Sequence, residues 1–448
     1  MKKIISLLVM LVSFSPFLSA QKMAEHVVII SIDGFRPDFY LDPSWSTVNM
    51  RQLASKGVCA ESVRGIFPSV TYPSHTTLIT GCFPDKHGIY FNTAISPEGN
   101  PGGWIYQFSK IKTETLWEAA RKAGITTASV SWPVSVDAPY IDYNIPEFWS
   151  FENPMDRREA TRLHATPRGL FEETSKYATG EMEMNDFNLT SLSMDENLSR
   201  IAGYILRKYK PGLLTIHLPN TDGAEHKQGR TGELVSRTIA GADHAVSVIV
   251  DALTKAGIFE KTAIIITGDH GFVTTHTAIA PNVWLTEKGV IKGVAKKAYF
   301  FSAGGSAFLH LKDKNDSATL ELIRSMLRTL PESQKEMFRV ISRSEMDRFG
   351  ADPDAVLALS ANEGFCFSNK TDGPLLTAAN GGKHGYFPDF PDISTGFIGY
   401  GPGFKQGVVI PAFGLEDVAP TAAYLLGIRM NKTDGTVLPG MMEQNGKK

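Results

Sequence analysis

The segment HVVIISIDG, residues 26–34, decides the fold class. Its first seven residues are almost continuously apolar, and an aspartate and a glycine follow at once. A short apolar run of this kind is typical of a strand that is buried on both faces of a parallel sheet. Asp33 then stands at the carboxyl end of the strand, where a buried acid needs a partner.

Similar alternations recur along the chain. Further strands are predicted at 125–132, 213–218, 263–267 and 396–400, and helices at 115–123, 242–256 and 419–426. Alternating strands and helices predict a three-layer α/β/α fold with a mainly parallel central sheet. Ligands bind at the carboxyl ends of the strands in such sheets, so acids that follow different strands are expected to converge there.

Two segments interrupt the alternation. Residues 144–197 are polar, rich in Met and Glu and weakly periodic, while residues 285–380 contain short strands and a helix at 318–330. We interpret both as insertions that cover the site, the second as a small cap. The domain organisation predicted is a signal peptide at 1–20 and one catalytic domain at 21–448, with the cap at about 285–380.

The first twenty residues differ from the rest. Two lysines precede an apolar run, Ile4–Leu18, and Ser19 and Ala20 follow it. This order is typical of a secretory signal peptide, and the run is shorter than the ~20 residues of a membrane-spanning helix. We therefore predict an exported protein, periplasmic or secreted, with no stable membrane anchor.

Composition restricts the partners. The chain of 448 residues is 42% hydrophobic and 21% charged, which is ordinary for a soluble globular protein. Its formal charge is -2, or about -4 without the signal lysines, so no basic field attracts long nucleic acids. The three cysteines, Cys59, Cys82 and Cys366, are too few for a disulfide framework, and a Cys59–Cys82 bond is left open.

The stretch FPSVTYPSH, residues 67–75, carries the candidate nucleophile. Two prolines hold Thr71 in a turn, and Ser74 is a candidate cap for a helix that begins just beyond. The Thr71 hydroxyl would then lie near a helix N-terminus, where anions are stabilised. This is a suitable place for a nucleophile that attacks phosphorus, and Asn92 and the backbone N–H after Thr71 are candidate donors to the phosphate oxygens.

Six acids and histidines of metal-ligand type lie at or near the predicted strand ends or, in one case, between glycines. They are Asp33, Asp222, His226, Asp269, His270 and His384. Imidazole and carboxylate suit zinc, and six groups suffice for two sites of three ligands each. A metal lowers the pKa of bound water from about 16 to about 7, and the Thr71 hydroxyl would be lowered in the same direction. The other histidines, among them His75, His87, His217, His244 and His276, are expected to have supporting or structural roles.

These motifs in this order resemble the alkaline phosphatase superfamily and, within it, the nucleotide pyrophosphatase/phosphodiesterase family. The resemblance covers nearly all of the mature chain and includes Trp132-Pro133 and the late Gly401–Lys405. It implies an alkaline phosphatase-like fold and two zinc ions per subunit. One zinc would be surrounded by Asp33, Thr71, Asp269 and His270, and the other held by Asp222, His226 and His384.

The resemblance also implies a covalent phosphoryl or nucleotidyl intermediate on Thr71. Tyr72 stands where the family has an aromatic residue that stacks on the nucleobase. Trp149 and Phe151 are the candidates for the opposing aromatic, because the sequence around them departs from the family's tyrosine-containing pattern.

The leading functional hypothesis is a zinc-dependent phosphodiesterase/nucleotide pyrophosphatase that acts on a small-molecule phosphoester, a nucleotide. A phosphate monoesterase on the same two-metal core is the main alternative, and phosphonate or lipid head-group hydrolysis and a catalytically silent binding protein are others. Monoesterase relatives resemble one another in a Lys-x-Arg pair, and none occurs between Trp132 and Asp156. This favours the diesterase.

The first prediction concerns export. Because the run that ends at Ala20 has signal-peptide form, the mature protein is expected to begin at or near Gln21. N-terminal sequencing of protein from the exported fraction measures this. An intact Met1–Ala20 segment on mature, active protein would contradict it.

Overall fold

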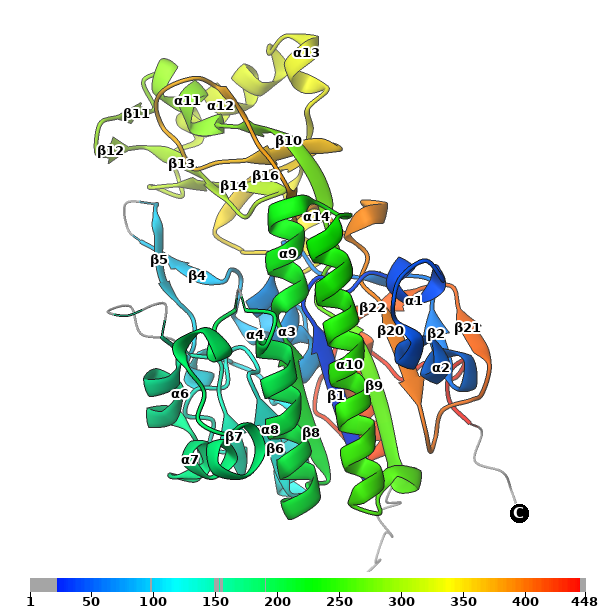
Figure 1. Cartoon of the computed structure of the whole chain (residues 1–448). Coiled ribbons are helices and arrows are strands. Elements are labelled where there is room, and N and C mark those ends of the chain that lie inside the picture. Colours follow the sequence, from blue (N-terminus) through cyan, green and yellow to red (C-terminus); the bar gives the residue numbers. More distant parts are fainter. Residues whose placement is uncertain (1–21, 97–98, 149–152, 154–155, 190, 444–448) are drawn as a thin grey trace, which may run out of the picture.

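The computed structural model describes residues 22–443 except 97–98, 149–152, 154–155 and 190 (Figure 1). The predicted signal peptide and the residues Trp149 and Phe151 therefore lie outside the described residues. Among the helices that the structure describes, none combines the length and apolar character that crossing a membrane requires.

An eight-stranded sheet forms the centre of the molecule. Its order is β21 (Val408–Ile410), β2 (Val58–Ala60), β20 (Phe397–Tyr400), β9 (Thr262–Gly268), β1 (His26–Ile32), β8 (Leu213–Leu218), β6 (Thr127–Val130) and β7 (Tyr143–Ile145). All neighbours are parallel except β20, which is antiparallel to β9 and β2. This confirms the mainly parallel sheet, with the first predicted strand at its centre.

Helices cover both faces of the sheet because alternate side chains of β1 enter two different cores. Val28, Ile30 and Ile32 pack with α8 (Met194–Tyr209) and α10 (Glu233–Lys255), which lie side by side in front of the sheet in Figure 1. Val27 and Ile29 pack with α3 (Thr71–Thr80), α5 (Leu116–Lys122) and α15 (Val418–Leu425) on the other face. Both faces are therefore apolar, which explains the continuous apolar run.

A smaller antiparallel sheet lies at the top of Figure 1. Its order is β13 (Ala298–Ser302), β14 (Ser306–Leu311), β16 (Ala355–Ala361) and β15 (Phe338–Ile341). With α12 (Ser317–Arg328) it shares a hydrophobic core that includes Leu309, Ile323 and Leu359. The strand β10 (Val273–Ile279) pairs with β19 (Gly382–Lys383), which immediately precedes His384. A covering role for this sheet stays a prediction.

The start of α3 differs from the prediction. Val70 occupies the N-cap and the helix begins at Thr71 itself, while the Ser74 hydroxyl has no hydrogen-bond partner among the described residues. The predicted cap is therefore wrong. Proline is tolerated within the first turn because the first helical N–H groups have no acceptor in the helix, so Pro73 lies inside α3 instead of before it.

Two other features went beyond the sequence patterns. The segment 144–197 contains α6 (Arg158–His164), α7 (Leu170–Thr174) and the start of α8, and α8 was not predicted. Its buried stripe of Leu198, Ile201 and Ile205 follows a polar first turn that masks the pattern.

All three cysteines are buried and free, so the structure contains no Cys59–Cys82 bond.

Candidate metal centre

Three adjacent strands bring the predicted metal ligands to one edge of the sheet. Ile32 of β1 is in register with Leu218 of β8 and Gly268 of β9, so the three strands end together. Asp33 follows β1, and Asp269 and His270 follow β9. Asp222 lies in the first turn of α9 (Asn220–Gln228), which begins two residues after β8. The parallel arrangement thus converts acids that are far apart in sequence into neighbours.

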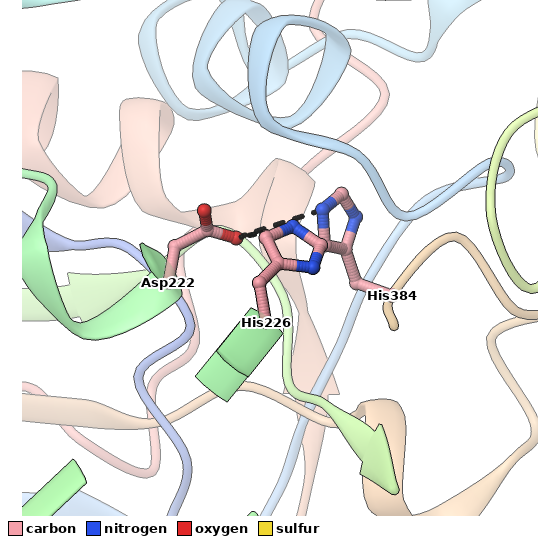
Figure 2. Close-up of side chains that lie close together, drawn as sticks. All are labelled: Asp222, His226 and His384. Atoms are coloured by element: carbon pink, nitrogen blue, oxygen red, sulfur yellow. Dashed lines mark ion pairs between the residues drawn. The ribbon is translucent and has the colours of Figure 1, made fainter. Parts of the chain in front are cut away.

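The first group is Asp222, His226 and His384 (Figure 2). Asp222 Oδ1 lies 3.3 Å from His226 Nε2, one helical turn away, and 3.6 Å from His384 Nε2. Nδ1 of His226 lies 3.0 Å from the Gly382 carbonyl, and Nδ1 of His384 lies 3.2 Å from the Ser69 carbonyl. Because a carbonyl only accepts, each Nδ1 carries a proton, and each Nε2 is directed toward Asp222.

The second group surrounds His270 Nε2. Asp269 Oδ2 lies 3.1 Å from this nitrogen, Asp33 Oδ1 3.4 Å and Thr71 Oγ1 3.5 Å. The His270 ring stacks on the His384 ring with centroids 3.8 Å apart, so the two groups adjoin. The structure therefore brings together all seven residues predicted as ligands.

The charges of this centre are unbalanced without a cation. Asp33 and Asp269 are buried, and Asp33 Oδ1, Asp222 Oδ1 and Asp269 Oδ2 have no hydrogen-bond partner among the described residues. Burial and neighbouring carboxylates raise the pKa of Asp33 and Asp269, and burial lowers the pKa of His384 to about 4. Carboxylate oxygens without a hydrogen bond that are grouped with imidazole nitrogens fit divalent cations such as zinc.

Asn92 is held by the backbone next to Thr71, the candidate nucleophile. Its Oδ1 accepts a hydrogen bond of 2.8 Å from the Tyr72 N–H, whereas its Nδ2 has no partner among the described residues. An N–H has one hydrogen, so the Tyr72 N–H, which was predicted to donate to phosphate, is already used by Asn92. The Asn92 amide remains as the candidate donor.

Tyr72 is enclosed by the protein. Its ring is completely buried against Trp104 and Tyr106, and its hydroxyl donates to Glu147 Oε1 over 2.9 Å. No face of the ring is accessible to a nucleobase in this structure, which contradicts the predicted stacking role. The physical reason is the hydroxyl, which finds a buried acceptor in Glu147.

Supporting residues complete the centre. His217 Nε2 lies 3.1 Å from Asp33 Oδ2, and its Nδ1 lies 3.0 Å from Glu147 Oε2. His75 Nδ1 lies 2.9 Å from the Thr71 carbonyl. Sequence reasoning gave both histidines supporting roles but missed Glu147. This residue follows β7 by two positions, so the strand-end rule that found Asp33 would have found it if the segment had not been assigned to an insertion.

Comparisons with known proteins agree with this architecture. The family model for type I phosphodiesterase / nucleotide pyrophosphatase matches residues 27–387. Human ectonucleotide pyrophosphatase/phosphodiesterase family member 5 is 22% identical over 441 residues, which cover 97% of this chain and 81% of that protein. Human bis(5′-adenosyl)-triphosphatase is 21% identical, with 93% of this chain and 82% of that protein covered. Human family member 1 is 23% identical over 91% of this chain, which spans only 40% of that longer protein.

Solved structures show the same fold. Murine ectonucleotide pyrophosphatase/phosphodiesterase 5 superposes with a TM-score of 0.66 at 20% identity, covering 92% of this chain and 97% of that chain. An inactive variant of that murine protein in complex with AMP superposes with the same TM-score at 19% identity.

Gly385, which follows His384, provides a test of how the packing around His384 affects metal binding. Gly385 has φ +89°, and a Cβ there would lie 1.8 Å from the Ala303 carbonyl oxygen. We expect Gly385→Ala to displace His384 and to lower both the zinc content per chain and the Tm. Elemental analysis and thermal unfolding measure the two effects.

The matched control is Gly373→Ala. Gly373 has φ +81° but a Cβ there would meet nothing within 4 Å, so this variant introduces only the backbone strain of about 1 kcal/mol. If the two variants had equal zinc content and Tm, the close packing around His384 would not matter for metal binding.

Proposed function

The chain belongs to the type I phosphodiesterase / nucleotide pyrophosphatase family of hydrolases, and we propose that it hydrolyses nucleotide phosphodiesters and pyrophosphates with two zinc ions and with Thr71 as nucleophile. The observation that carries this proposal is the position of Thr71 Oγ1, at the first residue of α3 and 3.5 Å from His270 Nε2. The similarity to human bis(5′-adenosyl)-triphosphatase supports a nucleotide as the substrate.

Seven residues would hold the metal ions. Asp222, His226 and His384 would form one set. Asp33, Asp269 and His270 with Thr71 would form the other, and Asp222 also lies close to Asp33 and His270. Two zinc ions bound there would supply Lewis acidity that favours the ionised Thr71 hydroxyl and stabilises the charge on the leaving oxygen. The partial exposure of Asp222, His226 and His384 gives this side of the centre access to solvent and to substrate.

The residues of the chain perform the rest of the reaction. Thr71 Oγ1 attacks phosphorus, the new O–P bond forms, and the bond to the leaving oxygen breaks. Water then attacks the nucleotidyl ester, which releases a 5′-nucleotide and restores the Thr71 hydroxyl. Throughout, Asn92 Nδ2 is oriented to donate to a non-bridging phosphate oxygen, because its Oδ1 is held by the Tyr72 N–H.

Two features of the sequence outside the metal centre agree with the proposal, one on location and one on substrate size. The N-terminal segment supports export, and the negative formal charge supports a small-molecule nucleotide as substrate rather than a long nucleic acid. Because the Tyr72 ring is buried, it does not support recognition of the nucleobase. The proposal therefore rests on the phosphoester chemistry.

Metal binding and chemistry are separable by mutation. Six protein groups hold the ions without the threonine, so Thr71→Ala is expected to retain close to two zinc per chain while kcat falls by more than about a thousandfold. His384→Ala is expected to lose zinc and activity together. Elemental analysis beside steady-state kinetics distinguishes them, and near-normal turnover by Thr71→Ala would rule out the covalent route.

Substrate preference is the second test of the proposal. The centre lacks a Lys-x-Arg pair between Trp132 and Asp156 for the additional charge of a monoester. We therefore expect a higher kcat/KM for an aryl ester of a 5′-nucleotide than for the matching aryl phosphomonoester. A faster reaction with the monoester would favour the phosphatase alternative instead.

A further inference from the structure

We propose that Glu147 and His217 are positioning residues that join the metal side of the centre to its phosphate side through one buried chain of hydrogen bonds. The inference rests on the proposed function for the roles of Asp33 and Asn92 at the two ends of this chain. The chain itself is a feature of the structure.

Three hydrogen bonds in series run from Asp33 to the Tyr72 hydroxyl, and a fourth runs from the Tyr72 backbone N–H to Asn92. Asp33 Oδ2 lies 3.1 Å from His217 Nε2, His217 Nδ1 lies 3.0 Å from Glu147 Oε2, the Tyr72 hydroxyl donates to Glu147 Oε1 over 2.9 Å, and the Tyr72 N–H donates to Asn92 Oδ1 over 2.8 Å. Five residues from distant parts of the sequence are thus connected by four hydrogen bonds. We call them the Asp33–Asn92 chain.

Each member has little freedom to find another partner. Tyr72, Glu147, His217 and Asp33 are all less than 5% exposed. Glu147 uses one carboxylate oxygen for each of these neighbours, and the positive charge of the buried Arg157 also acts on it. His217 uses one ring nitrogen for each neighbour, with the Ser131 carbonyl also 3.2 Å from Nδ1. Buried polar groups that lose a partner are not compensated by water, so a change at one member is transmitted to the next.

The arrangement determines how the two ends face the reaction. Because His217 engages Oδ2 of Asp33, the remaining oxygen Oδ1 is directed toward His270 Nε2, 3.4 Å away. At the other end, Tyr72 follows Thr71 directly and fixes Asn92 through its N–H. His75 adds a second connection, since its ring packs on His217 with centroids 4.4 Å apart and its Nδ1 lies 2.9 Å from the Thr71 carbonyl.

The role of Tyr72 follows from this geometry. The hydroxyl, which a base-stacking ring does not need, anchors Glu147, and the backbone N–H orients the amide that would bind phosphate. The Asp33–Asn92 chain therefore fixes the nucleophile relative to the metal-binding carboxylate from inside the protein. Removal of a group that is hydrogen-bonded to a metal ligand commonly lowers metal affinity or activity by about 10- to 100-fold.

The test uses Tyr72→Phe, Glu147→Gln and His217→Gln in the full-length protein. Tyr72→Phe removes one hydroxyl and preserves the buried ring. Zinc release to a chromogenic chelator is measured beside kcat and KM for an aryl ester of a 5′-nucleotide. We expect about tenfold faster zinc release and about tenfold lower kcat for His217→Gln, smaller changes of the same direction for Tyr72→Phe, and little change in KM.

The decisive readout is the coupling between the two ends. Tyr72 lies three hydrogen bonds from Asp33, so a purely local role for its hydroxyl would leave zinc release unchanged. If the chain acts as a unit, the double variant of Tyr72 and His217 resembles the worse single variant rather than the product of both effects. If His217→Gln fails to fold, zinc release by Tyr72→Phe alone, compared with that of wild type, tests the connection.

The matched control is His310→Gln. His310 Nε2 lies 2.9 Å from Asp352 Oδ2, and both residues are buried in the smaller sheet region. This variant cuts an equivalent buried pair outside the Asp33–Asn92 chain, so zinc release and kcat are expected to stay within twofold of wild type. Wild-type zinc release by Tyr72→Phe, or independent effects in the double variant, would overturn the proposal. Failure of wild type to cleave any diester would instead refute the proposed function, while the zinc measurements would still test the chain.

Discussion

The concentration of negative charge at the ends of β8, β1 and β9 is the constraint on which the rest of the structure depends. Asp33 and Asp269 are buried, Asp222 adjoins them, and each has a carboxylate oxygen without a hydrogen bond among the described residues. Burial of such groups is unfavourable unless cations compensate them. The parallel register of the three strands brings these carboxylates together. His226, His270 and His384 each have Nδ1 near a backbone carbonyl and Nε2 directed toward a carboxylate. The fold therefore builds a cluster of carboxylates and imidazoles that fits metal ions.

The position of Thr71, the proposed nucleophile, depends on a separate feature, the start of α3. Because α3 begins at Thr71, the Thr71 hydroxyl belongs to the first residue of the helix. Pro73 fits in the first turn because it has no N–H, and N–H groups there have no acceptor within the helix. The Tyr72 N–H donates to Asn92 Oδ1 and is therefore not available to an anion. The side-chain Nδ2 of Asn92 is the candidate donor in its place. The candidate metal ligands and the candidate phosphate donor thus come from separate segments. The buried contacts of Glu147 and His217 connect these segments beneath the surface.

The fold and the convergence of the candidate metal ligands were largely predictable because both follow from periodicity and strand ends. A buried parallel strand has a recognisable apolar run, and an acid that follows it has a defined place at the sheet edge, as Asp33 shows. The role of Tyr72 was not predictable, since a sequence motif does not show whether an aromatic ring faces solvent or a buried acceptor such as Glu147. The helix α8 was missed because its polar first turn continues the composition of the preceding segment. The start of α3 was misplaced because Pro73 is compatible with a position either before the helix or inside its first turn.

Anomalous diffraction from crystals of the zinc-loaded protein tests the central claim most directly. The account predicts two zinc peaks, one among Asp222, His226 and His384 and the other among Asp33, Thr71, Asp269 and His270. It also predicts that the Thr71 hydroxyl lies within coordination distance of the second ion. Absence of zinc from both groups in fully loaded, active protein, or zinc bound only elsewhere, would contradict it.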